Sequence, residues 1–179
     1  MALMTQRALG NALVRLLQQR PLSQITVNDI VEECGVARQT FYYHFQDIYD
    51  LLQWIFLQAA AEMSVQMAEA KTWRAKLLLL FHSILDNKTL VNNVYNSIDD
   101  AYIYRFIHTI PYDALLESFG VDPPHEQSAE EEAAIASFYL RLLFAILADW
   151  ICTGMRRPPE EILDEIELAL SINIFDHIK

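Results

Sequence analysis

The stretch ITVNDIVEECGVARQTFYYHF, residues 25–45, decides the fold of this chain. It contains two short segments with helical apolar periodicity, and a tight turn at Cys34-Gly35-Val36 separates them. The second segment carries so many large polar side chains that burying all of them with satisfied hydrogen bonds would be difficult. A helix-turn-helix whose second helix enters a DNA groove has this pattern. The alternative is a short, aromatic-rich core helix of a helical bundle.

The remainder of the chain is expected to be almost entirely helical. Hydrophobic residues make up 53% of the 179 residues, and only 4 Gly and 6 Pro are present, so few residues interrupt a helix. We expect about nine helices, with a loop over 120–128: residues 5–20, 26–35, 37–45, 47–69, 73–85, 90–97, 99–119, 130–153 and 158 onward.

Several residues mark where these helices begin and end. Thr26 and Asp29 have the spacing of a capping box, Gly35 suits a positive φ at a helix end, and Asp47 is expected to cap the fourth helix. Ala37 offers no side-chain cap to the third helix, which weakens that end by about 1 kcal/mol. The face of the first helix that we expect to be buried consists of Ala8, Leu9, Ala12, Leu13, Leu16 and Leu17.

The formal net charge of −11 argues at first against nucleic-acid binding. The charge is unevenly distributed, however. Residues 1–50 carry four basic and five acidic side chains, whereas residues 51–179 have a balance of −10. The helix-turn-helix region is therefore close to neutral, which implies modest non-specific affinity for DNA.

The sequence indicates a cytoplasmic protein without a membrane partner. The longest uncharged apolar run, Leu142–Ala148, is far shorter than the roughly 18 residues of a membrane span. The first ten residues, MALMTQRALG, lack the charged-then-apolar order of a signal peptide. Cys34 and Cys152 form no CxxC motif and are expected to be buried free thiols in a reducing compartment.

The third helix is expected to have a buried face and a DNA-facing face. Val36, Phe41 and Phe45 recur at helical spacing and should seat the helix on the first two. Arg and Gln side chains suit base edges, while hydroxyls and the His ring suit phosphates. The side chains of these kinds on the opposite face are Arg38, Gln39, Thr40, Tyr42, Tyr43 and His44.

The run Thr26-Val27-x-Asp29-Ile30-x-x-x-Cys34-Gly35-Val36-Ala37-Arg38-x-Thr40-Phe41-Tyr42-x-His44-Phe45 closely resembles the N-terminal domain of the TetR family of bacterial transcriptional regulators. The resemblance covers about the first 55 residues. It implies that phosphates are held by Thr26, Thr40, Tyr42 and His44, and that bases are faced by Arg38, Gln39 and Tyr43. The run from Arg38 to Tyr42, with Trp150-x-x-x-Gly154 and Pro159-Glu160-Glu161, resembles the branch that includes regulators of dihydroxyacetone kinase operons.

Two positions depart from the family pattern. Ile48 stands where the family usually has a Lys that pairs with a phosphate, so it is not among the expected DNA contacts. Ala37 stands where the family often has a capping Ser or Thr. Both departures imply weaker anchoring on the DNA backbone, so binding is expected to depend on the avidity of a dimer.

The helix over 130–153 has a wider apolar girdle than one core-facing stripe needs. Burial within one subunit is one explanation. The family resemblance implies another, in which this helix and the last one form a four-helix bundle with a second copy. The two recognition helices would then meet major grooves about 34–36 Å apart. The residues expected at this dimer interface are Tyr139, Leu143, Ile146, Trp150, Ile166, Leu170 and Ile174.

The middle of the chain is rich in aromatic residues. In the family this region surrounds an effector pocket, although core packing explains most of these residues without a ligand. The candidate pocket residues are Trp54, Trp73, Phe81, Tyr102, Phe106 and Phe138.

No enzyme motif is present: the chain has no GxSxG, no Gly-rich phosphate loop and no HExxH, and we expect neither cofactor nor metal. We therefore expect an all-α, two-domain protein, with a DNA-binding domain over 1–45 and a ligand-binding and dimerisation domain over 46–179. It would act as a homodimeric repressor on a palindromic operator, with a small effector moving the helix over 47–69 like a lever. One alternative is a regulator or activator controlled by a protein partner, and another is a helical interaction protein that never touches DNA.

Overall fold

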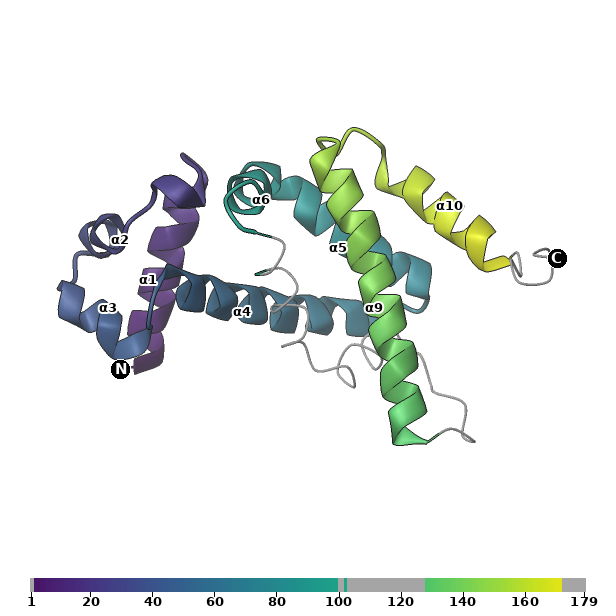
Figure 1. Ribbon diagram of the computed structural model, residues 1–179, viewed down its shortest axis with the longest axis horizontal. Helices are drawn as coiled ribbons and strands as arrows, with labels where there is room; N and C mark the ends of the chain where they lie inside the picture. The colour runs from purple at the N-terminus through teal and green to yellow at the C-terminus, as the bar shows by residue number, and fades with distance from the viewer. Residues whose placement is uncertain (1, 100–101, 103–127, 172–179) are drawn as a thin grey trace. The chain divides into compact units, whose positions relative to one another are not determined.

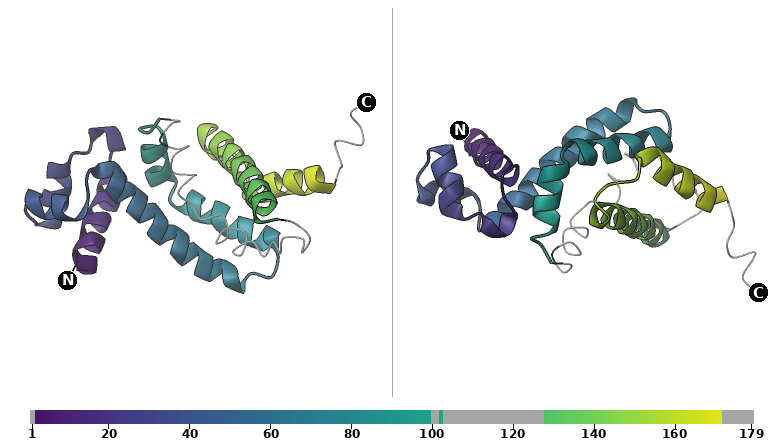
Figure 2. Two further views of the ribbon diagram at one scale, coloured as in Figure 1. Left: turned by 60° about the horizontal axis from the view of Figure 1, so that its bottom comes forward. Right: turned by 90° about the horizontal axis from the view of Figure 1, so that it is seen from above.

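The computed structural model describes residues 2–99, 102 and 128–171 (Figures 1 and 2). These ranges contain eight α-helices and one 3-10 helix, which confirms the all-α class. Most of the expected helix over 99–119 and of the loop over 120–128 lies outside the described residues. Packing divides the chain into two units, one within Met1–Met63 and Asn87–Thr109, the other within Ser64–Asp86 and Ile110–Lys179.

The first unit is built around α1 (Ala2–Leu17), which packs against α2 (Val27–Cys34) and α3 (Arg38–His44), as Figure 1 shows. The short 3-10 helix η1 (Leu22–Gln24) joins α1 to α2. Apolar side chains from all three α-helices meet in one core, and those with no exposed surface include Leu9, Leu13, Ile30 and Phe41. The expectation for Ala8 was wrong, because it is exposed at the edge of the buried face of α1.

The same core is closed by α4 (Ile48–Glu69) and α6 (Lys88–Tyr95). Asn93 on α6 donates a hydrogen bond of 2.8 Å to the Leu17 carbonyl, one of the carbonyls at the end of α1 that have no partner within the helix. The ring of Trp54 approaches to 3.0 Å from the place where a Cβ on Gly10 would lie, so only glycine leaves this space free. α4 and α6 thus share the core of the first three helices. The domain boundary that we expected after residue 45 remains a prediction.

Helix ends in the first unit follow the sequence signals. The capping box predicted for α2 is confirmed: Asp29 N donates to Thr26 Oγ1 over 3.3 Å, and Thr26 N donates to Asp29 Oδ2 over 2.7 Å. Gly35 ends α2 with φ 71°, and Asp47 Oδ1 accepts from Asp50 N over 2.9 Å at the start of α4. Ala37 makes no side-chain cap on α3, as predicted.

The second unit contains α5 (Trp73–Asp86), α9 (Ala129–Cys152) and α10 (Pro159–Ser171). Its core includes Phe81 and Trp150, whose ring centroids are 4.9 Å apart, and Leu163. The Trp150 indole donates a hydrogen bond of 2.9 Å to the Arg157 carbonyl and so ties the turn between α9 and α10 to the core. A second capping box, Ser128 with Glu131, begins α9 at a position that the sequence analysis assigned to a loop.

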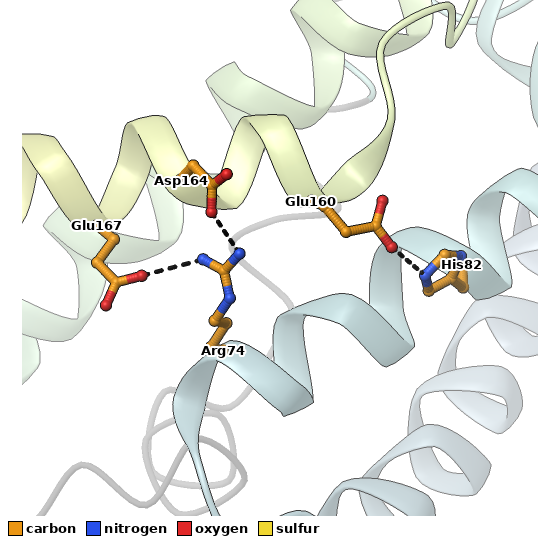
Figure 3. A network of polar contacts seen from close by, with 5 residues as sticks. All are labelled: Arg74, His82, Glu160, Asp164 and Glu167. Carbon is orange, nitrogen blue, oxygen red and sulfur yellow. Dashed lines mark hydrogen bonds and ion pairs between the residues drawn. The ribbon is translucent and has the colours of Figure 1, made fainter.

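Ion pairs line the contact between α5 and α10 (Figure 3). The Arg74 guanidinium binds Asp164 and, over 3.0 Å, Glu167. About two turns further along α5, His82 Nε2 lies 3.3 Å from a Glu160 carboxylate oxygen. These groups are largely exposed, so each pair adds little to stability, and the buried apolar side chains of α10 hold the helix in place.

Neither cysteine forms a disulfide, in line with the expectation of free thiols. The expectation that both are buried was wrong, because Cys152 is exposed at the end of α9 and Cys34 is half-buried.

One helical segment, residues 133–152 of α9, is long and apolar enough to cross a membrane by length and composition alone, with a mean hydropathy of 1.7. Only 18% of it is buried inside the protein. It contains Arg141 and Asp149, both exposed, which is why no uncharged run of this length appears in the sequence. A large apolar surface on α9 therefore requires an explanation, and the absence of a membrane partner stays a prediction.

The pKa of Asp29 provides a test of the α2 capping box. Hydrogen bonds from the Thr26 side chain and backbone, together with the Arg20 guanidinium, lower this pKa from 3.8 to about 2. A depressed pKa stabilises the fold above the unfolded value and loses that effect as the pH falls from about 4 to 2. In urea unfolding, Asp29→Asn should therefore be less stable than the wild type above pH 5, and the difference should shrink towards pH 2. A difference that stays constant over this range would contradict the assignment.

Candidate nucleic-acid interface

The outward-facing helix α3 is fixed by two buried aromatic rings. Phe41 has no exposed surface and Phe45 is 4% exposed. The two ring centroids are 5.9 Å apart, and Phe45 also packs against Trp54 at 6.0 Å. A helix of seven residues has little stability of its own, so this packing determines which of its side chains reach solvent.

The opposite face of α3 presents the predicted DNA contacts to solvent. Arg38 and Gln39 are exposed, Tyr42 is 48% exposed and Tyr43 81% exposed. Thr40 and His44 are half-buried at the margins of this face. The six side chains thus share one helix whose inner face is anchored, which is the arrangement needed for a helix that docks in a groove. Their individual DNA contacts remain predictions.

Thr26 differs from the other predicted contacts because its polar groups are already occupied. Its hydroxyl donates to Asp29 Oδ2 over 2.6 Å and accepts from Asp29 N, and its own N–H donates to the same carboxylate oxygen. A hydroxyl has one proton to donate. For Thr26 to bind a phosphate, as the family resemblance implies, the hydroxyl must release Asp29.

The positive charge available to DNA is small. Among the four arginines of residues 1–50, Arg15 pairs with Glu33 at 2.6 Å and Arg20 pairs with Asp29 at 2.8 Å. Within the described part of the chain, Arg7 and Arg38 have no carboxylate partner. Of these two, only Arg38 lies on α3. Ion pairing thus reduces an already neutral surface to two available cations.

The candidate effector residues are divided between the two units. In the first, Trp54 packs on Phe45, and the Tyr102 hydroxyl donates to the Tyr49 carbonyl over 3.0 Å. In the second, Phe81 is fully buried, Trp73 is half-buried and Phe138 is 63% exposed. Phe106 lies outside the described residues. Neither unit by itself brings this set together, so a pocket remains a prediction.

The candidate dimer residues differ in their exposure. Tyr139 is 48% exposed, and it lies with Phe138 and Leu142 in an exposed apolar stripe on α9 that begins at Ile135. Leu143, Ile146 and Ile166 are half-buried, the Leu170 side chain and Ile174 lie outside the described residues, and Trp150 is only 2% exposed. Trp150 therefore belongs to the core of its own protomer and supports the surface from beneath.

A shallow cleft of about 300 Å³ lies at the end of this stripe, between α9 and α10. Ile146 and the edge of Trp150 line it from α9, and Ile162 and Glu165 line it from α10. Arg157 spans its rim through a bidentate ion pair with Glu165, at 2.6 and 3.0 Å, and this pairing lowers the pKa of the Glu165 carboxyl. No local sequence pattern indicates this cleft, because it depends on how the two helices pack.

Comparison with protein families decides the class of this chain. Residues 11–55 match the model described as bacterial regulatory proteins, tetR family, and residues 71–171 match a transcriptional regulator C-terminal region of the same family. The second match covers more than half of the chain. The chain belongs to the TetR family of bacterial transcriptional regulators. The predictions of a DNA-binding regulator and of a protein that is not an enzyme are thereby confirmed.

Individual relatives place this TetR-family member more closely. It is 28% identical over 157 residues to the HTH-type dhaKLM operon transcriptional activator DhaS of Lactococcus lactis subsp. lactis (strain IL1403), covering 86% of this chain and 82% of the relative. The solved structure titled dihydroxyacetone kinase operon activator DhaS superimposes with a TM-score of 0.66 at 26% identity, covering 94% and 96% of the two chains. The predicted likeness to dihydroxyacetone kinase operon regulators is thus confirmed.

A third likeness concerns the fold alone. A TetR transcriptional regulator from Rhodococcus sp. RHA1 superimposes with a TM-score of 0.70 over 97% of this chain and 99% of that chain, although the identity is only 16%.

In the part of the chain that the structure describes, no group of three His, Cys, Asp or Glu side chains is arranged to hold a metal ion.

The scarcity of free cations predicts a weak dependence of DNA binding on salt. Each phosphate neutralised contributes a slope of about −0.9 to a plot of log K against log salt concentration. We call residues 1–50 the recognition head. With Arg7 and Arg38 as the available cations of each head, two heads on one operator should give a slope no steeper than about −4 in fluorescence anisotropy titrations with NaCl. A slope near −8 would show that other cations contact the DNA.

Proposed function

We propose that this TetR-family regulator binds a palindromic operator as a homodimer in the cytoplasm and is controlled through its C-terminal helices. The observation that carries the dimer is the exposed apolar stripe on α9, formed by Ile135, Phe138, Tyr139 and Leu142. Their exposed fractions range from 37% to 63%, and exposed apolar patches often mark sites of protein–protein contact.

A second copy of the chain is the partner that this surface fits best. The four residues recur at spacings of three and four, so they form one seam along the helix. Phe138 and Tyr139 form an edge-to-face pair at 5.7 Å in the middle of the seam, and aromatic residues are enriched at protein interfaces. Two-fold pairing would bury the seam of each copy against the same seam of the other. Exposed Arg141 and Asp149 on the same helix favour this arrangement over a membrane.

The residues proposed for each task follow from these positions. Arg38, Gln39 and Tyr43 would face bases, and Thr40, Tyr42, His44 and Thr26 would hold phosphates. Leu143, Ile146 and Ile166 would lie at the margin of the dimer seam, which their half-buried side chains support. Their assignment, like that of Leu170 and Ile174, is carried by the family resemblance.

Control through the C-terminal helices has two candidate agents. A small effector would occupy space near the half-buried Trp73 and the buried Phe81, and contact with Phe81 would require the core to open. A protein partner is favoured by a different observation: α10 presents the exposed carboxylates Glu160, Glu161, Asp164, Glu165 and Glu167. Part of this charge is already paired with Arg74 and Arg157, so a basic partner would compete with internal ion pairs.

The dimer is tested by Leu142→Glu, which places a charge in the middle of the seam. Because Leu142 is 44% exposed, the fold of the protomer should be unaffected, whereas a buried unpaired carboxylate in the interface should dissociate the dimer. We expect sedimentation equilibrium to show a dimer for the wild type and a monomer for the variant.

Val65→Glu is the matched control, because Val65 is an apolar residue of α4 that is 71% exposed and lies off the seam. This variant should remain a dimer. A monomeric wild type, or a Leu142→Glu protein that is still dimeric, would contradict the proposal.

Repression, the outcome expected from the sequence, is the first candidate for the sign of control. The likeness to a protein named as an operon activator favours a second candidate, activation. A reporter gene behind the region upstream of this gene distinguishes them. Activation predicts higher output when the chain is supplied, and Arg38→Ala should abolish the increase. Lower output with the wild-type chain would establish repression instead.

A further inference from the structure

Arg38 and Tyr42 form a contact on the outer face of α3. Arg38 Nη2 donates a hydrogen bond of 3.1 Å to the Tyr42 hydroxyl oxygen, and the guanidinium carbon lies 5.5 Å from the centroid of the Tyr42 ring. The two residues are four apart, so they are neighbours on one side of the helix. One aromatic side chain thus holds the guanidinium through both its oxygen and its π face.

The Tyr42 ring is itself held by the core. Its edge packs against Phe41, with ring centroids 5.5 Å apart and an angle of 82° between the planes. Phe41 has no exposed surface, so a chain of contacts runs from the core through Tyr42 to Arg38. Tyr43 provides a contrast on the same helix, because it is 81% exposed and, among the described aromatic residues, its ring pairs with the half-buried His44. The position of Arg38 is therefore determined by a side chain that the core orients.

The hydrogen-bonding capacity of both groups leaves room for DNA. The Tyr42 hydroxyl accepts from Arg38 and keeps its own proton, which a phosphate oxygen can accept. The guanidinium uses one of its five N–H donors and keeps enough of them to bind guanine O6 and N7 together. In the described part of residues 1–50, Arg38 also has no carboxylate partner to compete for these donors, unlike Arg15 and Arg20.

We propose that Arg38 reads a guanine in the operator and that Tyr42 is its positioning residue. The hydroxyl of Tyr42 would join a phosphate on one side to Arg38 on the other, so that the phosphate contact and the base contact act as one unit. This inference rests on the proposed function, in which α3 enters the major groove. Loss of a phosphate contact alone lowers affinity for all sequences equally. Loss of a positioning residue also lowers the preference for one base.

The experiment measures base preference rather than affinity alone. Duplexes are selected from a random pool with the full-length wild-type chain, and each base pair of the selected site is then replaced in turn. Affinities for this set are measured by fluorescence anisotropy with the wild type, Arg38→Ala, Tyr42→Phe and the double variant. Tyr49→Phe is the matched control, since it removes the hydroxyl of a 44% exposed tyrosine of α4 that is not among the proposed DNA contacts. Thermal unfolding of each variant confirms that it is folded.

Arg38→Ala should abolish the preference for one guanine, a loss of about tenfold or more. Tyr42→Phe should reduce the preference for the same guanine by at least about threefold, whereas in the Arg38→Ala background it should not change base preference further. Tyr49→Phe should leave that preference intact. Arg38→Lys should also lose the preference while retaining the salt dependence, because lysine keeps the charge without the planar fork.

Two results would overturn the inference while leaving the proposed function standing. In one, Tyr42→Phe weakens binding to every duplex by the same factor and the guanine preference persists. In the other, the effects of the two substitutions on base preference are independent of each other. If the wild-type chain enriches no sequence from the pool, the proposed function fails, and this inference fails with it.

Discussion

The burial of Phe41 and Phe45 in the core of the first unit is the constraint on which the rest of this structure depends. Helix α3 has seven residues and no side-chain cap at its beginning, so it has little intrinsic stability. Its two buried rings fix the rotation of the helix about its own axis. For that reason the side chains that point to solvent are those of Arg38, Gln39, Tyr42 and Tyr43. A loss of the packing beneath them would disorder the surface that is proposed to contact DNA.

Internal ion pairing limits the free positive charge of the recognition head. Two of its four arginines are paired with carboxylates, Arg15 with Glu33 and Arg20 with Asp29, and are therefore less available to phosphates. Thr26 is likewise engaged in its own capping box. A head with so little free charge gains little from non-specific attraction to DNA. Under the proposed function, strong binding comes from specific contacts of α3 and from two heads held together through the exposed seam on α9.

Local sequence signals predicted much of this fold because their physics is local. The capping box at Thr26, the positive φ at Gly35 and the uncapped Ala37 were all readable, since each depends on residues within one helical turn. Trp150 shows what local sequence signals cannot predict. Its apolar spacing on α9 fitted a dimer surface equally well, and only the packing of α5 and α10 around α9 places it in the protomer core, against Phe81. The exposure of Cys152 and the contact between Arg38 and Tyr42 were missed because they depend on side-chain positions in three dimensions.

We propose that a nearly neutral recognition head binds DNA effectively only in pairs. The most direct measurement compares the affinity of the full-length chain for a selected duplex with two half-sites and for the same duplex with one half-site scrambled. We predict a loss of about 100-fold or more, because the second head binds at the high effective concentration that the dimer imposes. Affinities within about threefold of each other would show that one head suffices, and would contradict this account.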